Sequence, residues 1–588
     1  MTDYSSLNSE QHEAVFSDQP QILCLAGAGT GKTQVLTRRV ARLYEAGVSP
    51  TNMLALTFTR AAGAEMKERV IGLIGADGKE LFCNTFHSFC VDTIRAFAHE
   101  LGYEPNFSVY DQPECDELLA EVLTSLKYKI PAKRVADFRA GRVDNMTASD
   151  RQQAERALKE YEFRLRRNNA FDFDGLINTV KKAVYNREDI RLNLQQKYKH
   201  IFVDEFQDTD AEQWAIVQGI NPDNVFVVGD DFQSIYGFRG SDITIILGLA
   251  ENTQWHTVKL ERNYRSSTPI VCAANALIKH NHQTEKQLLT LKEGAKIECR
   301  RPGDDVAEIT AILPRLEANQ KLGSYKTTAI LARTNKQLER AKGLLTANNI
   351  QFETLASSSD NPFSSKGAKE LIAWIAAIEN PLDDTAVRRI ANIRASKKAL
   401  LDADWTQVQD NIPLLDALKV TKEAEQFISQ FNFVRERFHA NANISEGANR
   451  IATTLKIDDR GARYAITKWH QRQIDLGEPE TPAALLEWVR LGNVAERQDK
   501  ERDASKVYLM TVHGSKGLEF DEVFIIGATQ GTFPNRGDLE EERRLFYVAI
   551  TRAREYLNIS SPNAMTGWNG KVQAAQRSQF VSEAGLLF

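Results

Sequence analysis

The octapeptide AGAGTGKT, at residues 26–33, constrains the fold of this chain more than any other segment. The residues before it, ILCL, have the pattern of a short buried strand, and the residues after it, QVLTRRVARL, have helical periodicity. A glycine-rich turn between a strand and a helix allows backbone N–H groups to curl inward around phosphate groups. The segment therefore predicts a P-loop on an α/β fold, with a plain glycine-rich turn as the alternative interpretation.

Each residue of the octapeptide is a candidate nucleotide contact: Ala26, Gly27, Ala28, Gly29, Thr30, Gly31, Lys32 and Thr33. The ammonium group of Lys32 would reach the β and γ oxygens of a triphosphate, and the hydroxyl of Thr33 would ligate Mg²⁺. Ala26 stands where the pattern usually has its first glycine.

A second apolar strand, IFV at residues 201–203, ends in the carboxylates Asp204 and Glu205. In a P-loop enzyme, the first acid would hold Mg²⁺ through water, and the second would take a proton from the attacking water. A solvated acidic turn is the alternative interpretation.

Seven segments share one organisation, in which an apolar strand leads into a polar or glycine-rich turn. They are QILCLAGAGTGKT, MLALTFT, HIFVDEFQDT and VFVVGDDFQS in the first half, and TTAILART, YLMTVHGSKG and EVFIIGA in the second. Continuous apolar strands that alternate with helices predict parallel sheets covered on both faces, with ligands bound where the strands end. The two groups of strands therefore predict two α/β domains.

A mainly helical insertion is expected in each α/β domain. In the first insertion, residues 96–184, Asp111 and Glu114 fit a capping box with Pro113 in the first turn of a helix. The second insertion is residues 382–503. The first α/β domain then comprises residues 1–95 and 185–262, and the second comprises residues 263–381 and 504–588 with the C-terminal tail.

Composition limits the classes of protein that remain. At 588 residues, and roughly 150 residues per domain, about four domains are expected. The formal net charge of −5 argues against coating of nucleic acid by overall charge, although it permits a local basic channel. Six cysteines without a C-x-x-C pair do not indicate a zinc or iron–sulfur site. No membrane-length apolar run or secretory signal is evident, so we expect a cytoplasmic protein with no membrane partner.

Six further motifs follow in order: TFTRAA (57–62), TFHSF (85–89), VVGDDFQSIYGFRGS (227–241), LERNYRSST (260–268), TVHGSKGLEF (511–520) and EEERRLFYVAITRAR (540–554). With the two nucleotide motifs they resemble superfamily 1A DNA helicases of the UvrD/Rep/PcrA type. The resemblance covers nearly the whole chain and is weakest between residues 390 and 500. It implies an α/β protein with two RecA-like P-loop motor domains, each interrupted by a helical insertion, that uses ATP and Mg²⁺.

The resemblance implies further nucleotide contacts. Gln11 would read the adenine edge, Tyr264 would stack on the base, and Glu519 would contact the ribose. Gln233 would sense the γ-phosphate and relay its presence to the DNA site.

Arg265 and Arg552 are the candidate arginine fingers, both expected from the second α/β domain while the P-loop belongs to the first. Guanidinium groups delivered to the γ-phosphate stabilise transition-state charge, and such fingers accelerate hydrolysis by about 10³ to 10⁵. Hydrolysis would thus be coupled to domain movement. Taken singly, each arginine is equally compatible with a surface or ion-pairing role.

DNA contacts are expected from aromatic faces, because stacking contributes about 1 to 3 kcal/mol per base without reading sequence. The candidates are Phe58, Phe173, Tyr236 and Phe238, with Arg239 on a phosphate or a ring, and the resemblance adds His87. For any single aromatic residue, a place in the core is the alternative. The family usually has tryptophan where Phe238 stands and asparagine-lysine at Arg60-Ala61, and its accessory insertion is longer.

The resulting hypothesis is an ATP-dependent helicase that moves 3′ to 5′ along single-stranded DNA and separates tailed duplexes, with the second insertion or the C-terminus available to protein loading factors. One alternative is a translocase that displaces proteins and unwinds weakly. A catalytically inactive DNA-binding scaffold and an unrelated P-loop GTPase or kinase are two others, both disfavoured by the set of motifs.

Overall fold

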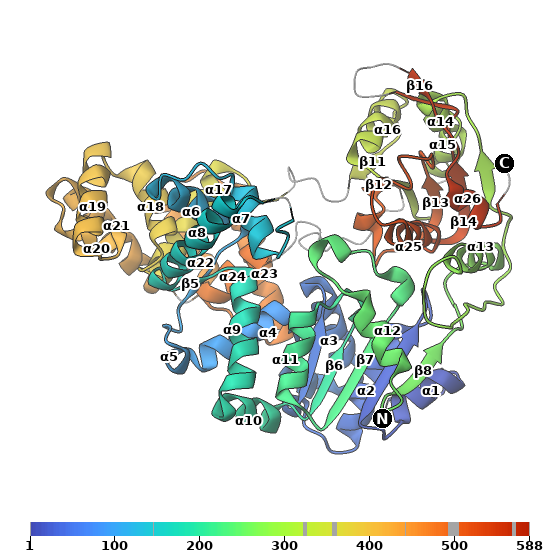
Figure 1. The fold of residues 1–588 in the computed structure, drawn as a ribbon, viewed down its shortest axis with the longest axis horizontal. Coiled ribbons are helices and arrows are strands. Elements are labelled where there is room, and N and C mark those ends of the chain that lie inside the picture. Colours follow the sequence, from blue (N-terminus) through green and yellow to red (C-terminus); the bar gives the residue numbers. More distant parts are fainter. Residues whose placement is uncertain are drawn as a thin grey trace. The chain divides into compact units, whose positions relative to one another are not determined.

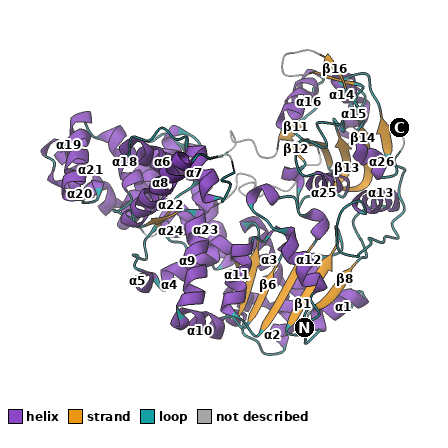
Figure 2. Cartoon of the chain, viewed as in Figure 1, coloured by secondary structure: helices purple, strands orange, loops and turns teal. Residues whose placement is uncertain are grey.

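The computed structural model describes residues 2–144, 146–321, 326–354, 361–441, 443–491, 505–566 and 572–586. The chain divides into two compact units, each made from separate stretches of sequence. Unit 1 comprises Met1–Thr85, Asn193–Ser357 and Val494–Phe588, and unit 2 comprises Phe86–Leu192 and Ser358–Asn493. Strands are concentrated in unit 1, whereas unit 2 is almost entirely helical (Figure 2). Within the described ranges, no helix combines the length and apolar character needed to cross a bilayer.

The first sheet of unit 1 has six parallel strands in the order β3-β2-β6-β7-β1-β8. Figure 1 labels β6, β7 and β8 of this sheet. Their bounds are β1 (Gln21–Ala26), β2 (Met53–Thr57), β3 (Phe82–Thr85), β6 (His200–Val203), β7 (Asn224–Gly229) and β8 (His256–Leu260). The accompanying helices are α1 (Ser9–Phe16), α2 (Lys32–Glu45), α3 (Arg60–Ile74), α11 (Ala211–Ile220) and α12 (Ile243–Glu251). β1 is buried after its first residue and β2 is buried throughout, as expected of parallel strands covered on both faces.

The second sheet of unit 1 also has six parallel strands, in the order β11-β12-β10-β13-β14-β9. Their bounds are β9 (Glu298–Arg300), β10 (Thr328–Ala332), β11 (Phe352–Thr354), β12 (Val507–Thr511), β13 (Phe520–Ile525) and β14 (Ala553–Ser560). One apolar cluster joins the sheet to α13 (Thr268–Ile278), α25 (Leu539–Ile550) and α26 (Gln579–Glu583). Another joins it to α14 (Asp305–Thr310), α15 (Leu313–Lys321) and α16 (Asn335–Ala347). A short antiparallel pair, β15 (Ala564–Thr566) and β16 (Val572–Ala574), completes unit 1.

All seven strands predicted from apolar runs are present, as β1, β2, β6 and β7 in the first sheet and β10, β12 and β13 in the second. The prediction of two parallel sheets is therefore confirmed. The other five strands of the two sheets, β3, β8, β9, β11 and β14, lie outside these seven runs. β9 and β11 are short edge strands, and β14 carries the polar residues Arg554, Glu555 and Asn558 within its run.

The first stretch of unit 2 forms α4 (Phe86–Ala96), α5 (Ala98–Leu101), α6 (Gln112–Ser125), α7 (Ala132–Arg139), α8 (Ala148–Arg167), α9 (Phe173–Asn186) and the short parallel pair β4 (Ser108–Val109) and β5 (Ala170–Phe171). α10 (Glu188–Lys197) leads back to the first sheet. The capping box predicted for α6 is confirmed: the Asp111 side chain accepts from the Glu114 N–H, and the Glu114 side chain accepts from the Asp111 N–H, both at 3.0 Å.

The second stretch of unit 2 forms α17 (Lys366–Glu379), α18 (Asp384–Arg394), α19 (Lys397–Asp410), α20 (Leu414–Val420), α21 (Glu425–His439), α22 (Ile444–Leu455), α23 (Arg460–Leu476) and α24 (Pro482–Leu491). Buried polar contacts join the two stretches. Asp383 accepts from Ser108 and Tyr110 at 2.7 Å, and Arg490 donates to Glu114 at 2.7 Å.

The helical unit begins earlier along the chain than the insertion boundaries expected at residues 96 and 382, because α4 and α17 both belong to it. α17 is buried over almost its whole length in one apolar cluster with α18, α21 and α22. Its apolar residues predict a buried helix, but helical periodicity does not specify which neighbour the buried face contacts.

Candidate functional site

The P-loop connects β1, which lies between β7 and β8 in the first sheet, to α2, the first long helix of the chain. Gly29 and Gly31 have left-handed backbones, with φ of 68° and 87°. Thr30 closes the turn by donating from its hydroxyl to the Gly27 carbonyl at 2.9 Å. Gly31 precedes α2 without a side-chain cap, so the first N–H groups of the helix have no side-chain partner there, as anion binding requires.

The acidic pair follows β6, two strands away from β1 in the sheet. Glu205 has the positive φ of 48°, and its Oε1 lies 3.8 Å from Lys32 Nζ. Gln207 donates to Glu205 Oε2 at 2.6 Å. The structure thus brings together the lysine and the candidate base predicted from separate motifs.

The two adjacent carboxylates have opposite pKa shifts. Burial and the neighbouring charge of Glu205 raise the pKa of Asp204. Burial also disfavours ionisation of Glu205, but the charges of Lys32 and Lys516 outweigh it and lower the pKa of Glu205. Glu205 is therefore the ionised member, which suits a general base.

Thr33 and Asp204 offer the hard oxygen ligands that Mg²⁺ prefers. Asp204 is buried, and burial together with the charge of Glu205 raises its pKa, so a bound cation would favour its charged form. In the described ranges no group of three or more His, Cys, Asp or Glu residues is placed to hold a metal. A site with only one or two protein ligands is compatible with Mg²⁺, because this ion usually keeps several of its waters. The residues present therefore fit this ion.

Arg552 follows α25 of the second sheet and is 1% exposed. Its Nη2 donates to Gln233 Oε1 at 3.1 Å, while its Nε donates to the Val548 carbonyl at 3.0 Å. Gln233 follows β7 of the first sheet and donates from Nε2 to Asp230 at 2.5 Å. The candidate γ-phosphate sensor and one candidate finger are therefore hydrogen-bonded to each other.

The segment Asn263–Arg265 lies directly against the P-loop. Asn263 Nδ2 donates to the Ala28 carbonyl at 2.6 Å, and the Tyr264 N–H donates to the Gly29 carbonyl at 2.9 Å. A Cβ on Gly29 would lie 2.6 Å from Arg265 Cβ. Arg265 is therefore close to the P-loop.

Whereas Arg552 lies in the connection between α25 and β14 of the second sheet, Arg265 lies in the connection between β8 of the first sheet and α13. It contacts the second sheet's residues through an ion pair with Glu519 and a hydrogen bond from Nη1 to the Thr551 carbonyl at 3.4 Å. Burial acts to raise the pKa of Glu519, but Arg265 and Arg554 outweigh it and lower that pKa. The candidate ribose contact is thus an ionised carboxylate beside the candidate finger.

Gln11 and Tyr264, the candidate adenine contacts, both bond to the backbone of the P-loop. Gln11 is buried and donates to the Thr30 carbonyl at 2.9 Å. Tyr264 is 52% exposed, and its hydroxyl accepts from Asn8 Nδ2 at 3.0 Å. Asn8 also caps α1, where it forms a capping box with Gln11. An exposed ring beside a buried amide is an arrangement that could hold a flat heterocycle.

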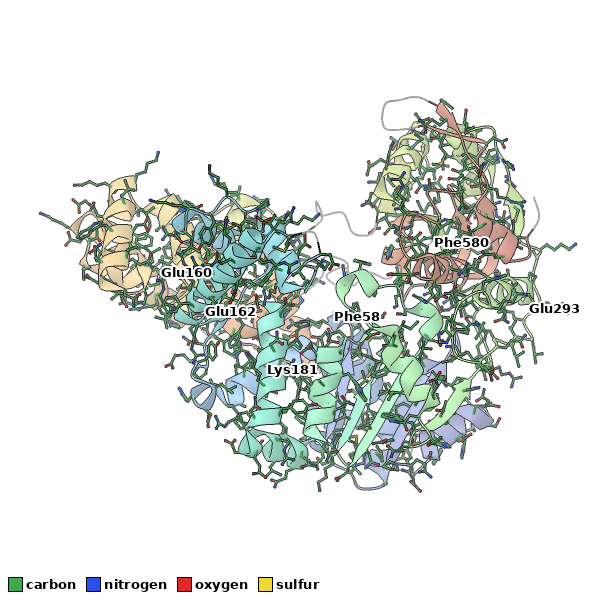
Figure 3. All side chains as sticks on the ribbon, in the orientation of Figure 1. Phe58, Glu160, Glu162, Lys181, Glu293 and Phe580 are labelled. Atoms are coloured by element: carbon green, nitrogen blue, oxygen red, sulfur yellow. The ribbon has the colours of Figure 1, made fainter. Side chains whose placement is uncertain are left out.

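A cluster of rings lies after β2, after β7 and after β12. Phe58 (Figure 3) stacks on Tyr236 with ring centroids 5.0 Å apart and planes 15° apart. Phe238 is 66% exposed and contacts His513 edge to face at 5.7 Å. The Arg239 guanidinium lies 5.3 Å from the Tyr236 ring and 5.7 Å from the Phe238 ring. Four of the six candidate DNA contacts therefore form one aromatic and cationic surface.

The other two candidates, His87 and Phe173, pair with each other in unit 2. Their ring centroids are 5.5 Å apart, and they lie in the first turns of α4 and α9 respectively. Asp172 caps α9 by accepting from the Gly175 N–H at 2.7 Å.

Several residues of the site were missed by sequence reasoning. His513 contacts the rings of Tyr236 and Phe238, and burial lowers the pKa of its imidazole to about 4, so it is neutral near pH 7. Lys516 bonds to Asp208 at 2.5 Å and to the Gln233 carbonyl at 2.7 Å. Both lie in the motif TVHGSKGLEF, and their position directly after a strand was the available signal.

Two residues of α25 also contact the segment that carries the rings. Arg544 donates to the Ser234 carbonyl at 2.8 Å, and Glu541 accepts from the Gly237 N–H at 3.1 Å. Through these two side chains, α25 is therefore hydrogen-bonded to the backbone on either side of Tyr236.

We call each sheet of unit 1, with the helices packed on it, a lobe. Two RecA-like α/β lobes, with a P-loop in the first and a buried arginine from the second, define a two-lobed P-loop NTPase. Family models agree with this class. The UvrD/REP helicase N-terminal domain matches residues 7–254, and the UvrD-like helicase C-terminal domain matches residues 258–437 and 421–564.

Relatives match along nearly the whole chain. The ATP-dependent DNA helicase PcrA of Staphylococcus epidermidis is 33% identical over 634 aligned residues, which cover 98% of this chain and 86% of the relative. The helicase of the same name from Staphylococcus aureus is 32% identical over 635 aligned residues, with the same coverage. The chain therefore belongs to the UvrD/Rep/PcrA family of superfamily 1A ATP-dependent DNA helicases. The resemblance inferred from the ordered motifs is confirmed.

Proposed function

We propose that this helicase hydrolyses Mg-ATP between the two lobes of unit 1 and uses the cycle to move 3′ to 5′ along single-stranded DNA, separating tailed duplexes. The observation that carries the proposal is the hydrogen bond between Gln233 and Arg552. Gln233 follows β7 in the first lobe and lies three residues before Tyr236, whereas Arg552 follows α25 in the second lobe. Nucleotide and DNA contacts thus share one short segment.

In the nucleotide site, Lys32 neutralises the β and γ oxygens, and Gln11 and Tyr264 hold the base. Glu519 contacts the ribose. Glu205 takes a proton from the attacking water, and its lowered pKa keeps it ionised for this role. Thr33 and Asp204 would hold Mg²⁺, which supplies charge neutralisation on the phosphate oxygens.

Arg265 and Arg552 stabilise the charge that develops on the transferring phosphoryl group. Arg552 needs both lobes in contact, because it bonds to Gln233 of the first and to Val548 of the second. Closure and opening of the lobes would therefore accompany each turnover, and alternating grip on one strand would give directional movement.

The aromatic surface of Phe58, Tyr236, Phe238 and Arg239 supplies the grip in unit 1, and His87 with Phe173 supplies it in unit 2. Stacking tolerates any base, as a translocating enzyme requires. Single-stranded and tailed duplex DNA are the proposed partners. Protein loading factors would contact the second insertion or the C-terminus.

The test of the nucleotide site uses Lys32→Ala and Glu205→Gln. We expect DNA-stimulated ATP hydrolysis to fall by at least about 100-fold in each, while binding to single-stranded DNA survives. Near-normal turnover in either variant would refute the site assignment.

Direction and output need a second measurement, in which the unaltered protein acts on duplexes with 3′ or 5′ tails. We expect strand separation only from the 3′ tail. A translocase that mainly displaces proteins would instead remove streptavidin from biotinylated DNA while leaving duplexes intact. This translocase is the second candidate function, because the second insertion is shorter than the accessory insertion usual in the family. A scaffold without catalysis would show neither activity.

A further inference from the structure

Lys286 is a buried cation that none of the helicase motifs contains. It lies in the connection between α13 and β9, and its side chain is 0% exposed. Its Nζ lies 2.7 Å from Asp230 Oδ1 and 2.5 Å from Asp231 Oδ1, and 4.1 Å from the centre of the Phe232 ring. Both carboxylates are also 0% exposed. The cluster therefore holds one cation and two carboxylates with no access to water.

The segment Thr284–Leu289, which we call the strap, fixes Lys286 in place. Thr284 donates to Asp231 from both its N–H and its hydroxyl at 2.9 Å. The Leu289 N–H donates to the Glu261 carbonyl at 2.8 Å. Leu288 packs so closely over the P-loop that a Cβ on Gly27 would lie 2.1 Å from its Cδ2. The strap is therefore held against the first sheet on either side of Lys286.

Asp230 connects this lysine to the candidate γ-phosphate sensor. Its Oδ1 accepts from Lys286, and its Oδ2 accepts from Gln233 Nε2 at 2.5 Å. An amide group presents a donor on one side and an acceptor on the other. With Nε2 held by Asp230, the acceptor Oε1 faces Arg552 Nη2 at 3.1 Å. The orientation of the Gln233 amide thus depends on a carboxylate that Lys286 anchors.

Asp230 also connects to Glu205, the candidate general base. Its backbone N–H donates to Gln207 Oε1 at 2.8 Å, and Gln207 Nε2 donates to Glu205 Oε2 at 2.6 Å. This link uses the backbone of Asp230 and not the carboxylate that Lys286 holds, so loss of the Lys286 side chain should affect the sensor and spare the base.

We propose that Lys286 is a positioning residue for ATP hydrolysis, which fixes the Asp230 carboxylate and thereby aims the Gln233 amide at Arg552. This inference rests on the role proposed for Gln233. The lysine side chain is fully buried beside Asp230, Asp231 and Phe232, so it would act through these residues. Burial acts to lower its pKa, but the two aspartates outweigh burial and raise it, so the anchor stays charged.

The test compares the kinetics of DNA-stimulated ATP hydrolysis in Lys286→Met, Gln233→Ala and the double variant. For Lys286→Met we expect kcat to fall by about tenfold or more, with KM for ATP changed by less than about threefold, because the defect lies in the transition state. If Lys286 acts through Gln233, adding Lys286→Met to Gln233→Ala lowers kcat no further. Multiplied losses in the double variant would overturn the proposal.

Lys296→Met is the matched control, because Lys296 is an exposed lysine in the same connection. It should retain full kcat. A Gln233→Ala variant with normal kcat would refute the role proposed for Gln233. Normal kcat in Lys286→Met beside a defective Gln233→Ala would overturn the inference on Lys286 alone.

Lys286→Met leaves two buried carboxylates without their cation, which would destabilise the folded state. The variant Lys286→Met/Asp231→Asn keeps the native excess of one carboxylate and should fold and show the same loss of kcat, with thermal melting as the check. If neither variant folds, Lys286 serves stability alone and the proposal is overturned.

Discussion

Gly29 and Gly31 are the P-loop residues with left-handed backbones, at φ of 68° and 87°. Glu205, the candidate base, shares this conformation at φ of 48° although it carries a side chain. A non-glycine residue at positive φ costs free energy that surrounding contacts must offset. At the residue scale, the nucleotide site is therefore specified by backbone conformation as well as by side-chain chemistry.

Gly29→Ala should abolish most ATP hydrolysis, because the added Cβ would lie 2.6 Å from Arg265 Cβ and push the candidate finger from the P-loop. We expect kcat to fall by about 100-fold or more. Gly47→Ala is the control, since Gly47 also has positive φ, at 92°, but has no atom within 4 Å of the added Cβ. Both variants should lose about 1 kcal/mol in thermal unfolding from backbone strain. Equal ATP hydrolysis in the two would contradict the predicted clash.

Phe238→Ala should weaken binding to single-stranded DNA by about 1 to 3 kcal/mol, because an exposed ring that stacks on a base is removed. Nucleotide affinity should change little. Phe433→Ala is the control: Phe433 is 48% exposed on α21 and has an arginine, Arg437, 4.7 Å from its ring centre. Fluorescence anisotropy with labelled oligonucleotides measures the difference. Equal affinities would mean that Phe238 does not face DNA.

At the scale of elements, helix ends show how local sequence and distant contacts combine. The capping box of α6 is local, since Asp111 and Glu114 lie three residues apart. The cap of α9 is not local in the same way. Besides capping Gly175, Asp172 accepts from Arg139 at 2.5 Å and from Tyr161 at 3.0 Å. These partners come from α7 and α8, so Asp172 also joins three helices and sets the start of α9, where Phe173 stands.

Asp172→Ala should therefore destabilise unit 2 by about 3 kcal/mol, because it removes a cap and leaves buried donors unpaired. Thr147→Ala, which removes an ordinary cap from α8, should cost only about 1 kcal/mol. Thr147 accepts from the Asp150 N–H at 3.1 Å in an exposed position. Calorimetric melting of the full chain compares the two. Similar costs would show that the contacts with Arg139 and Tyr161 add nothing.

At the scale of the whole molecule, residues from both sheets of unit 1 share one apolar core. Ala28 and Phe232, which follow strands of the first sheet, lie in the same apolar cluster as Leu331 and Met510 of the second. Polar bridges cross the same boundary. Lys516, after β12, bonds to Asp208 and to the Gln233 carbonyl, which follow β6 and β7.

Lys516→Met should uncouple DNA binding from hydrolysis, because the bridge lies between the candidate sensor and the ring of Tyr236, 4.8 Å from Nζ. We expect the ratio of ATP hydrolysis with DNA to hydrolysis without it to fall about tenfold, a loss of roughly 1.4 kcal/mol of coupling. Lys342→Met, which removes only an ion pair with Glu339 within α16, should leave this ratio unchanged. An unaltered ratio in Lys516→Met would exclude this route of coupling.

Much of the fold could be predicted because its signals are local. Buried parallel strands such as β1 and β7 are continuous apolar runs, and the residues that follow them carry the nucleotide chemistry. β14 escaped prediction because Arg554, Glu555 and Asn558 interrupt its run. The neighbours of α17 could not be predicted, because helical periodicity does not specify which element a buried face contacts.

The sequence by itself determined the strand-turn-helix units, the P-loop, the acidic pair after β6 and the family, since each depends on residues that are neighbours along the chain. Only the tertiary structure decided which side chains meet across hundreds of residues. Arg552 reaches Gln233 over 319 positions, and Lys286 reaches Asp230 over 56. No periodicity or spacing encodes such pairs. They arise because parallel strands bring their carboxyl ends to one edge of a sheet, and because a buried charge must find an opposite charge or a hydrogen-bond partner there.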